Sequence, residues 1–445
     1  MSRKRIGIFP KDKDSIMTLI PPQDAEFCFL VAKDSNEAEW VNKFLKPTET
    51  YYYDASVTKK FISDLNTIDI LQQTDLLTVL NKNDIKYLYL DIATQEIEDW
   101  SIANQINLII TPYKFRKIYE NKILFDNLLA EYNIPKPRSS IVKFEENTEF
   151  TLPFSGKTVL QKSLSSGGEG TFFIDSVADI KRLIATKEIS YSEDYLLREY
   201  IPGTTYGITV FVAPGHVALS SIRLQCFAKN IYQQRNIFLG VQWVSYSAIS
   251  AELKQSIEEV FASIGDVLYK QHFFGFANFD FQVDVNKKVY LIECNARFSS
   301  ATVQYLKFHE LMGGVDIRNV FLETMINSTP FPKKYIFSGY PNTEFAGSSL
   351  KVNLYLDFNN ETVTISKQYP LGLYSQNGLT IKFKDPDIRN FSRLANEFIY
   401  YSDVVVEQKF SKFGEIARIV SNYPLFTLTG ALNDNGNTLL NHFEY

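Results

Sequence analysis

Cysteine and histidine are scarce in this chain. Its 445 residues include 3 cysteines and 4 histidines. Cys28, Cys226 and Cys294 are widely separated and have apolar neighbours, so their spacing predicts neither a disulfide framework nor a zinc site. None of the histidines stands in a nucleophile or zinc motif. A chain of this kind suits a reducing compartment, and we expect it to be cytoplasmic.

Clusters of positive charge and long apolar runs are also missing. The formal net charge is −5 and no block of basic residues occurs, so we expect no nucleic-acid surface. No apolar run reaches the roughly 20 residues that span a bilayer, and the basic residues 1–15 lack the apolar segment of a signal peptide. We therefore expect no membrane partner.

The length predicts two or three domains, because one core rarely serves more than about 250–300 residues. In residues 1–112, strand-like runs alternate with amphipathic stretches, which predicts a parallel α/β sheet. Gly7 stands alone after the first of these runs, so the three-glycine dinucleotide fingerprint is absent. From residue 346 onwards we expect short strands and a helix at 388–401, without a chemical motif.

The clearest chemical pattern lies in residues 276–299, FANFDFQVDVNKKVYLIECNARFS. Two alternating runs flank a polar turn, which predicts a β-hairpin. Glu293, Asn295 and Arg297 are spaced by two residues and share one face of a strand, and Asp280 joins them from the other run. Mg²⁺ binds such oxygens, and an arginine can neutralise a transferring phosphoryl group. The alternative is a solvated hairpin face.

A second pattern follows the strand-like run 158–162 and reads SLSSGGEGT. Glycines let backbone N–H groups converge on an anion, and serine hydroxyls add donors. Lys162 ends the run and is placed to contact the same phosphates as a point charge. A flexible surface turn is the alternative. The candidate phosphate-binding residues of this loop are Ser165, Ser166, Gly167, Gly168 and Gly170.

Taken in order, these segments resemble the ATP-grasp superfamily over residues 113–320. We expect a helix at 113–132, which ends before the prolines of NIPKP. NKILFDNLLAEYNIPKPRS, which begins in this helix, is similar to the segment that supplies one phosphate-binding lysine, here Lys122. VLQKSLSSGGEGT looks like the strand lysine and glycine-rich lid of the family, with Lys162 as the second lysine.

Two further motifs complete the resemblance. LLREYIPG is similar to the hinge whose backbone binds adenine, which implies Glu199, Tyr200 and Ile201. The family's magnesium ligands fall on Asp280, Glu293 and Asn295.

The resemblance also carries departures and substrate roles. Arg198 replaces the first hinge glutamate, and Thr205 stands where the family often has an acid for the ribose. Arg297 matches an arginine that stabilises an acyl phosphate. Arg223 ends an expected strand where ligases of the superfamily often approach the substrate carboxylate; an ordinary edge-strand arginine is the alternative. The stretch 225–241 has no clear period and is expected to be a loop over the site.

The resemblance implies an α/β fold, α+β in its ATP-grasp part. It implies a pre-ATP-grasp domain at 1–112, an ATP-grasp domain at 113–345 divided near residue 200, and a C-terminal extension at 346–445.

The activity implied is an ATP-dependent carboxylate–amine ligase that uses ATP with Mg²⁺ or Mn²⁺ and forms an amide through an acyl phosphate. Arg297 and Lys162 would be catalytic. The expected substrates are an amino acid or small acid and an amine, or a peptide or carrier-bound acyl group, and a homodimer is possible. A bicarbonate-using carboxylase and an inactive ATP-binding scaffold are the alternatives.

Overall fold

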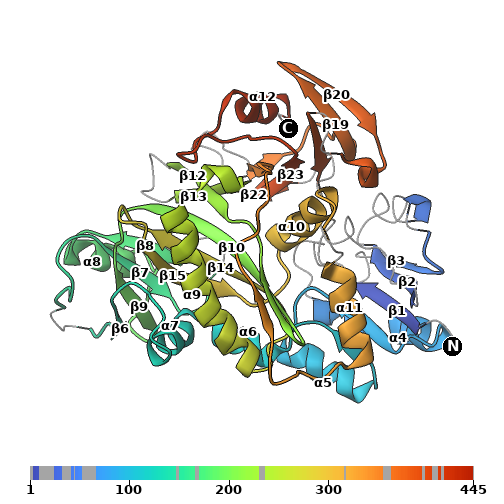
Figure 1. Ribbon diagram of the computed structural model, residues 1–445, viewed down its shortest axis with the longest axis horizontal. Helices are drawn as coiled ribbons and strands as arrows, with labels where there is room; N and C mark the ends of the chain where they lie inside the picture. Colours follow the sequence, from blue (N-terminus) through green and yellow to red (C-terminus); the bar gives the residue numbers. More distant parts are fainter. Residues whose placement is uncertain are drawn as a thin grey trace.

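The computed structural model describes residues 4–9, 25–32, 42–44, 46–52, 67–146, 150–165, 170–229, 236–314, 317–353, 362–392, 396–402, 409–411 and 415–443. Figure 1 shows the fold coloured along the chain, with the N-terminal sheet at one end and the C-terminal strands at another. Three sheets determine where the candidate site lies.

The N-terminal sheet is parallel and has the order β3-β2-β1-β4-β5. Helices flank it, so the predicted alternation of strands and helices is confirmed in this region. One helix begins at Thr94, whose Oγ1 accepts a hydrogen bond from the Ile97 N–H and so caps the first turn. The elements are β1 (Lys4–Phe9), β2 (Ala25–Ala32), β3 (Thr50–Tyr52), α3 (Thr67–Leu71), α4 (Thr74–Lys82), β4 (Tyr87–Leu90), α5 (Gln95–Ala103) and β5 (Asn107–Ile109).

A small antiparallel sheet follows, with the order β6-β9-β7-β8. The helix predicted at 113–132 is wrong in one respect: it is two helices, because Asn121 starts a second one by accepting hydrogen bonds from the Ile123 and Leu124 N–H groups. The elements are α6 (Tyr113–Tyr119), α7 (Lys122–Glu131), β6 (Ser139–Lys143), β7 (Thr158–Lys162), β8 (Thr171–Ile174), α8 (Val177–Ala185) and β9 (Asp194–Glu199).

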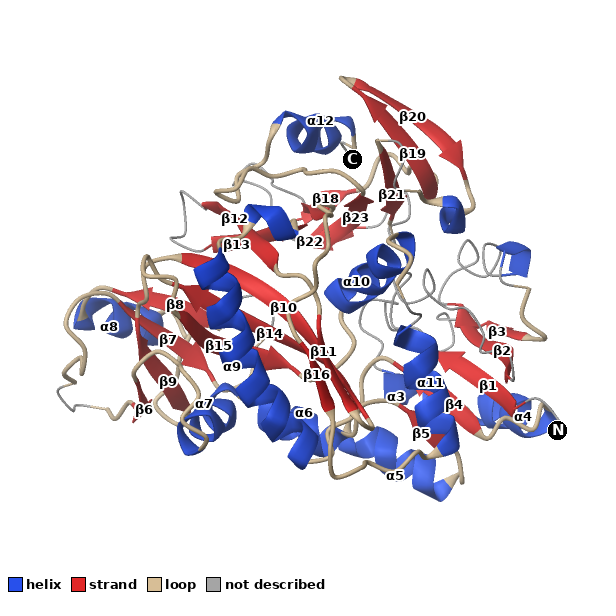
Figure 2. Ribbon diagram, viewed as in Figure 1, coloured by secondary structure: helices blue, strands red, loops and turns tan. Residues whose placement is uncertain are grey.

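The largest sheet has twelve strands within the described residues. Its main path runs β15-β14-β10-β12-β13-β17-β23-β21-β19-β20, and β11 pairs with β10 and with β16. Through the pairs β13–β17 and β17–β23 the sheet continues into the C-terminal strands, of which Figure 2 labels β19, β20, β21 and β23. The elements are β10 (Thr204–Ala213), β11 (His216–Leu219), β12 (Arg223–Lys229), β13 (Asn236–Trp243), β14 (Gly275–Val283), β15 (Val289–Asn295), β16 (Ile336–Ser338), β17 (Ser348–Asn353), β19 (Gly372–Asn377), β20 (Thr380–Asp385), β21 (Glu397–Tyr401) and β23 (Glu415–Ser421).

The two faces of β14 have different neighbours. Ala277, Phe279 and Phe281 pack with the long helix α9 (Ala251–Lys270), where the Phe261 ring lies 5.7 Å from that of Phe279. On the other face, Asn278 contacts α10 (Ser300–Leu311), where its Nδ2 donates to Thr302 Oγ1 at 2.9 Å. The apolar side therefore anchors the strand, while Asn278 and Asp280 are left for the other face.

Two expectations about this sheet are wrong. Residues 225–241 are not a loop: β12 and β13 pair as antiparallel strands, with 230–235 outside the described residues. The helix expected at 388–401 is instead a short 3₁₀ turn, η4 (Ile388–Asn390), followed by the buried strand β21. In both stretches, pairing with neighbouring strands decides the structure.

The remaining elements are a 3₁₀ turn η3 (Tyr246–Ala248), α11 (Ile317–Asn327), β18 (Thr362–Thr364), β22 (Lys409–Ser411) and α12 (Asp434–His442). Strands β18 and β22 form a separate two-stranded sheet. None of the helices in the described part of the chain has the length and apolar composition needed to cross a membrane.

Candidate active site

The predicted hairpin is confirmed as β14 and β15, and its register brings the acids together. Asp280 lies opposite Glu293, and Asn278 lies opposite Asn295. A β-bulge follows Asp280. Such a bulge changes the direction of the side chains beside it, as often seen next to active sites. Two carboxylates and two amides therefore meet on neighbouring strands.

The carboxyl group of Asp280 lies in a poorly solvated position, whereas the Glu293 side chain is 30% exposed. Burial and the neighbouring Glu293 charge raise the pKa of Asp280 well above its usual value, while Arg223 and Lys122 act in the opposite direction. Gln225 Nε2 donates a hydrogen bond to Asp280 Oδ1. A buried carboxyl group that faces a second carboxylate forms a place that a cation would stabilise.

These oxygens fit a magnesium ion but not a metal held by protein alone. Among the described residues, no group of three or more His, Cys, Asp or Glu side chains gathers to hold a metal. Asp280, Glu293 and Asn295 offer two carboxylates and one amide oxygen. Mg²⁺ commonly takes one or two protein carboxylates and completes its shell with phosphate and water.

Lys122 connects this hairpin to the glycine-rich loop. It is the first residue of α7, only 4% of it is exposed, and its Nζ lies 3.3 Å from Glu293 Oε2. The same ammonium donates to Ser165 O at 3.0 Å and to Ser165 Oγ at 3.3 Å. A buried ammonium with these partners can hold the loop and the acid on either side of an anion.

The described ends of the loop meet at the end of β7. Lys162 N donates to Gly170 O at 2.9 Å. A β-carbon at Gly170 would lie 2.5 Å from Ser165 Oγ, so only glycine lets the two ends approach this closely. Lys162 also lines a cavity of about 670 Å³ with Asn121, Leu164 and other residues. Ser166, Gly167 and Gly168, which were predicted to bind phosphate, lie outside the described residues.

The hinge residues follow β9. The Glu199 carboxylate accepts from the Arg138 N–H at 2.9 Å and pairs with Arg138 Nε at 2.7 Å, so this side chain fixes the chain before β6. Tyr200 is 39% exposed and its ring meets Phe173 edge to face. Ile201 is half-buried.

Thr205 is close to the hinge, on β10. Its Oγ1 donates to Gln282 Oε1 at 2.7 Å. The Thr205 hydroxyl is thus engaged across the sheet.

Arg297 is held from two sides. Its Nε lies 3.1 Å from Glu120 Oε1, and its Nη2 donates to Asn295 Oδ1 at 3.2 Å. Glu120 also forms a bidentate pair with Arg116, at 2.9 and 2.8 Å. One carboxylate therefore serves two guanidinium groups, which leaves a net positive charge beside the acids of the hairpin.

Arg223 begins β12, whereas the sequence predicted that it ends a strand. It is 3% exposed, and its Nη1 donates to Thr209 Oγ1 at 3.0 Å. A β-carbon at Gly207 would lie 2.8 Å from Arg223 Nε, so the missing side chain makes room for the guanidinium. Burial lowers the pKa of Arg223 to about 10, while Asp280 acts to raise it.

Sequence reasoning missed two residues that support the arginines. Glu120 holds Arg297, and Asn278 donates to the Arg297 carbonyl at 3.0 Å while its Oδ1 lies 3.4 Å from Arg223 Nη2. Asn278 precedes Asp280 by two residues, so the same alternation that selected Asp280 could have found it. Nothing in the sequence near Glu120 indicates its partner.

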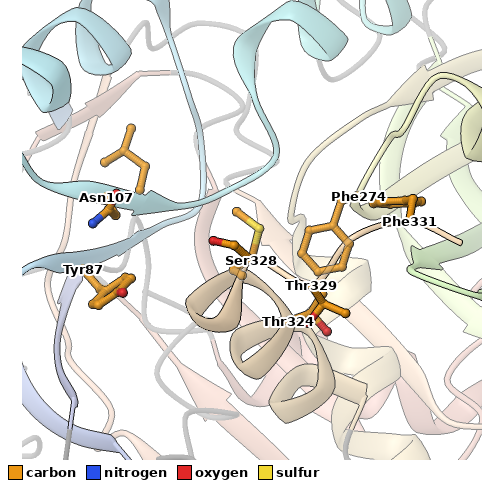
Figure 3. Close-up of a pocket in the computed structure, with 9 residues that line it drawn as sticks. Tyr87, Asn107, Phe274, Thr324, Ser328, Thr329 and Phe331 are labelled. Atoms are coloured by element: carbon orange, nitrogen blue, oxygen red, sulfur yellow. The ribbon is translucent and has the colours of Figure 1, made fainter.

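A separate cavity of about 430 Å³ lies between the N-terminal sheet and α11. Figure 3 shows Tyr87 and Asn107 on one side, and Thr324, Ser328 and Phe274 on the other. Its lining contains none of the residues predicted to bind nucleotide, metal or substrate.

No protein-family model matches the chain. A curated D-aspartate ligase of Enterococcus faecium (strain Aus0004) is 22% identical over 264 residues. That match covers 55% of this chain and 58% of the ligase, so the chain spans less than two thirds of this relative.

Solved structures resemble nearly the whole chain. The biotin carboxylase domain of the Hydrogenobacter thermophilus 2-oxoglutarate carboxylase, in complex with MgADP, ADP and bicarbonate, has a TM-score of 0.61 at 12% identity, over 95% of this chain and 86% of that one. The L-amino acid ligase from Bacillus licheniformis has a TM-score of 0.60 at 12% identity, over 99% and 97%. Both are ATP-grasp enzymes, and these likenesses show that the chain has the mixed α/β fold of the ATP-grasp ligases.

Proposed function

We propose that the chain is an ATP-dependent carboxylate–amine ligase that forms an amide bond and releases ADP and phosphate. The observation that carries this proposal is the gathering of Lys122, Glu293, Asp280 and Arg297 around one hairpin. Two of the proteins that the chain resembles are named as ligases of aspartate or amino acids. The two cationic side chains can bind phosphate and carboxylate groups, and the two acids can bind a metal ion.

The nucleotide contacts follow from the charges and the loop. Lys122 and Lys162 would neutralise the phosphates of ATP, with Ser165, Gly170 and the rest of the loop adding donors. The backbone at Glu199 to Ile201 would contact adenine, and Thr205 would lie near the ribose. Closing the loop would exclude water, which otherwise hydrolyses an activated acyl group.

The remaining side chains of the site are proposed to bind the metal and the substrate. Asp280, Glu293 and Asn295 would hold magnesium or manganese, which would supply positive charge to the phosphates of ATP. A substrate carboxylate would attack the γ-phosphoryl group, giving an acyl phosphate and ADP. Arg297 would hold this mixed anhydride, with Arg223 close by, until an amine displaces phosphate.

Amino acids are the substrates that this proposal favours, as free acids or within a peptide or carrier-bound acyl group. A carboxylase that uses bicarbonate is the second candidate, favoured by the Glu-x-Asn-x-Arg pattern of Glu293 to Arg297 and by the likeness to a biotin carboxylase domain. A homodimer is also part of the proposal, since that neighbour is a dimer. Light scattering of the purified protein tests the homodimer.

The deciding experiment measures phosphate release from MgATP with amino acids, singly and in pairs, and identifies the products by mass. We expect release that needs both a carboxylate and an amine, with a product lighter than their sum by one water. Release that depends on bicarbonate would favour the carboxylase. Nucleotide binding without turnover on any carboxylate, amine, peptide or bicarbonate would favour the scaffold.

A further inference from the structure

Arg198 is a buried charge at the joint between two sheets. It belongs to β9 of the small sheet and is 2% exposed. Burial lowers the pKa of its guanidinium, while Asp126 and the more distant Glu293 act to raise it. A charge in this position is stable only when other groups pair with it and accept its hydrogen bonds.

The guanidinium makes four hydrogen bonds to three elements. Its Nε and Nη2 donate to Asp126 Oδ1 on α7, at 3.2 and 3.0 Å. Its Nη1 donates to Gln161 Oε1 on β7 at 3.0 Å and to the Ile292 carbonyl on β15 at 2.7 Å. The planar fork of arginine suits this task because its donors point in fixed, different directions.

Each of these contacts lies beside a residue proposed to bind ATP or metal. Asp126 is one helical turn after Lys122, Gln161 directly precedes Lys162, and Ile292 directly precedes Glu293. Backbone neighbours move together, so a group that holds these three partners also fixes the separation of the two lysines and the acid.

The other oxygen of Asp126 has partners of its own. Asp126 Oδ2 accepts from Lys136 Nζ at 2.7 Å and from Ser139 Oγ at 2.6 Å. The carboxylate therefore keeps a cation even when the arginine is removed. This makes a substitution of Arg198 testable, because it does not leave Asp126 as an unpaired buried charge.

We propose that Arg198 is a positioning residue that sets the spacing of Lys122, Lys162 and Glu293 across the joint between the small and the large sheet. The proposal rests on the proposed nucleotide site. The proposal also gives a structural reason for Arg198, which stands where the resembled family has a hinge glutamate. The buried arginine connects α7, β7 and β15 through its hydrogen bonds. Arg198 itself contacts none of the reacting groups.

The test compares R198M and R198K with E397Q as a matched control. Glu397 is 4% exposed and pairs with Lys384 in the C-terminal strands, so E397Q disturbs a buried ion pair elsewhere. Binding of MgADP is measured by calorimetry, together with the midpoint of thermal unfolding and the magnesium concentration that gives half-maximal binding. We expect R198M to weaken MgADP binding and to raise that magnesium concentration by about 10- to 100-fold.

R198K separates charge from geometry. A lysine keeps the charge for Asp126 but cannot direct donors to Asp126, Gln161 and the Ile292 carbonyl at once. We expect the unfolding midpoint of R198K to lie close to that of the wild type. Its loss of MgADP affinity, expressed as the logarithm of the dissociation constant, should still be more than half of the loss in R198M. E397Q is expected to lower the unfolding midpoint while binding MgADP within twofold of the wild type.

The outcomes distinguish the two proposals. Wild-type protein that does not bind MgADP would overturn the nucleotide site itself. If the wild type binds MgADP and R198K or R198M binds it with the same affinity and magnesium dependence, the role of Arg198 alone would be overturned. If R198M does not fold, R198K decides, because it retains the buried charge: tight binding by R198K would contradict the proposal, and weak binding by a stable R198K would support it.

Discussion

Facing acids on neighbouring strands repel each other unless a cation lies near them. Asp280 and Glu293 are in this position, and Lys122 supplies one positive charge at 3.3 Å from Glu293. Burial and the Glu293 charge keep the pKa of Asp280 raised although Arg223 and Lys122 both act to lower it, so a further cation here would be stabilised. The charges of individual side chains, more than the shape of the site, therefore indicate what binds here.

Substituting Glu293 tests the metal role directly. We expect E293Q to lower turnover by about 100-fold or more. The amide is a weaker magnesium ligand and no longer forms an ion pair with Lys122. Circular dichroism and the unfolding midpoint should stay close to those of the wild type. The control is E259Q, on the exposed side of α9, where the Glu259 carboxylate accepts a hydrogen bond from Gln255 Nε2. Full activity of E293Q would remove Glu293 from the proposed metal site.

Arg297 offers a prediction that separates binding from chemistry. The variant R297M should fold, because Glu120 keeps its bidentate partner Arg116. Its MgADP affinity should stay within about twofold, whereas turnover should fall by about 100-fold, since the guanidinium is proposed to act on the acyl phosphate. Calorimetry and phosphate release measure the two effects. Equal losses in both assays would assign Arg297 to the nucleotide instead.

At the scale of elements, the loop after β7 depends on one glycine. In G170A the new β-carbon would overlap with Ser165, which contacts Lys122 through its carbonyl and hydroxyl. We expect MgADP binding to weaken by about tenfold, with a change in unfolding free energy of about 1 kcal/mol or less, because the overlap lies at a loop end that can shift.

A second glycine provides the control for this prediction. Gly378, at a turn between β19 and β20, has a positive φ, but unlike at Gly170 a β-carbon there meets no other atom within 4 Å. G378A should cost about 1 kcal/mol in stability through backbone strain and leave nucleotide binding unchanged. If G170A and G378A bind MgADP equally well, the loop has no part in nucleotide binding.

At the scale of the whole molecule, the large sheet joins regions on both sides of residue 346. Strand β13 pairs with β17, and the Phe426 N–H donates to Gln242 Oε1 at 2.9 Å. One apolar cluster combines Leu224 and Leu239 with Leu350 and Ile419. The domain limits at 112 and 345 stay a prediction, and the large sheet continues across the second of them.

A truncated chain of residues 1–345 tests whether the C-terminal extension folds separately. We expect this fragment to aggregate, because it exposes the edge of β13 and apolar side chains worth about 1.5–3 kcal/mol each when buried. Size-exclusion chromatography and thermal unfolding measure the outcome. A monodisperse fragment that unfolds cooperatively and binds MgADP would instead make residues 346–445 an independent domain.

Strand alternation explains why much of the site could be predicted. In residues 276–297 the side chains alternate between an apolar core and a polar face, and a strand has this period wherever it lies. The stretch 388–401 was misassigned because its strand β21 is buried on all sides, where apolar runs do not distinguish strand from helix. The assignment of the individual site residues stays a prediction.

The sequence by itself determined the hairpin, the order of the motifs and the glycine-dependent loop, because each depends on neighbours within a few residues. Only the tertiary structure decided the partners of the charges. Arg198 meets Asp126 and Ile292 across 72 and 94 residues, and Arg297 meets Glu120 across 177. Side chains so far apart in the chain meet only where packed sheets and helices bring them together, and no local pattern records their pairing.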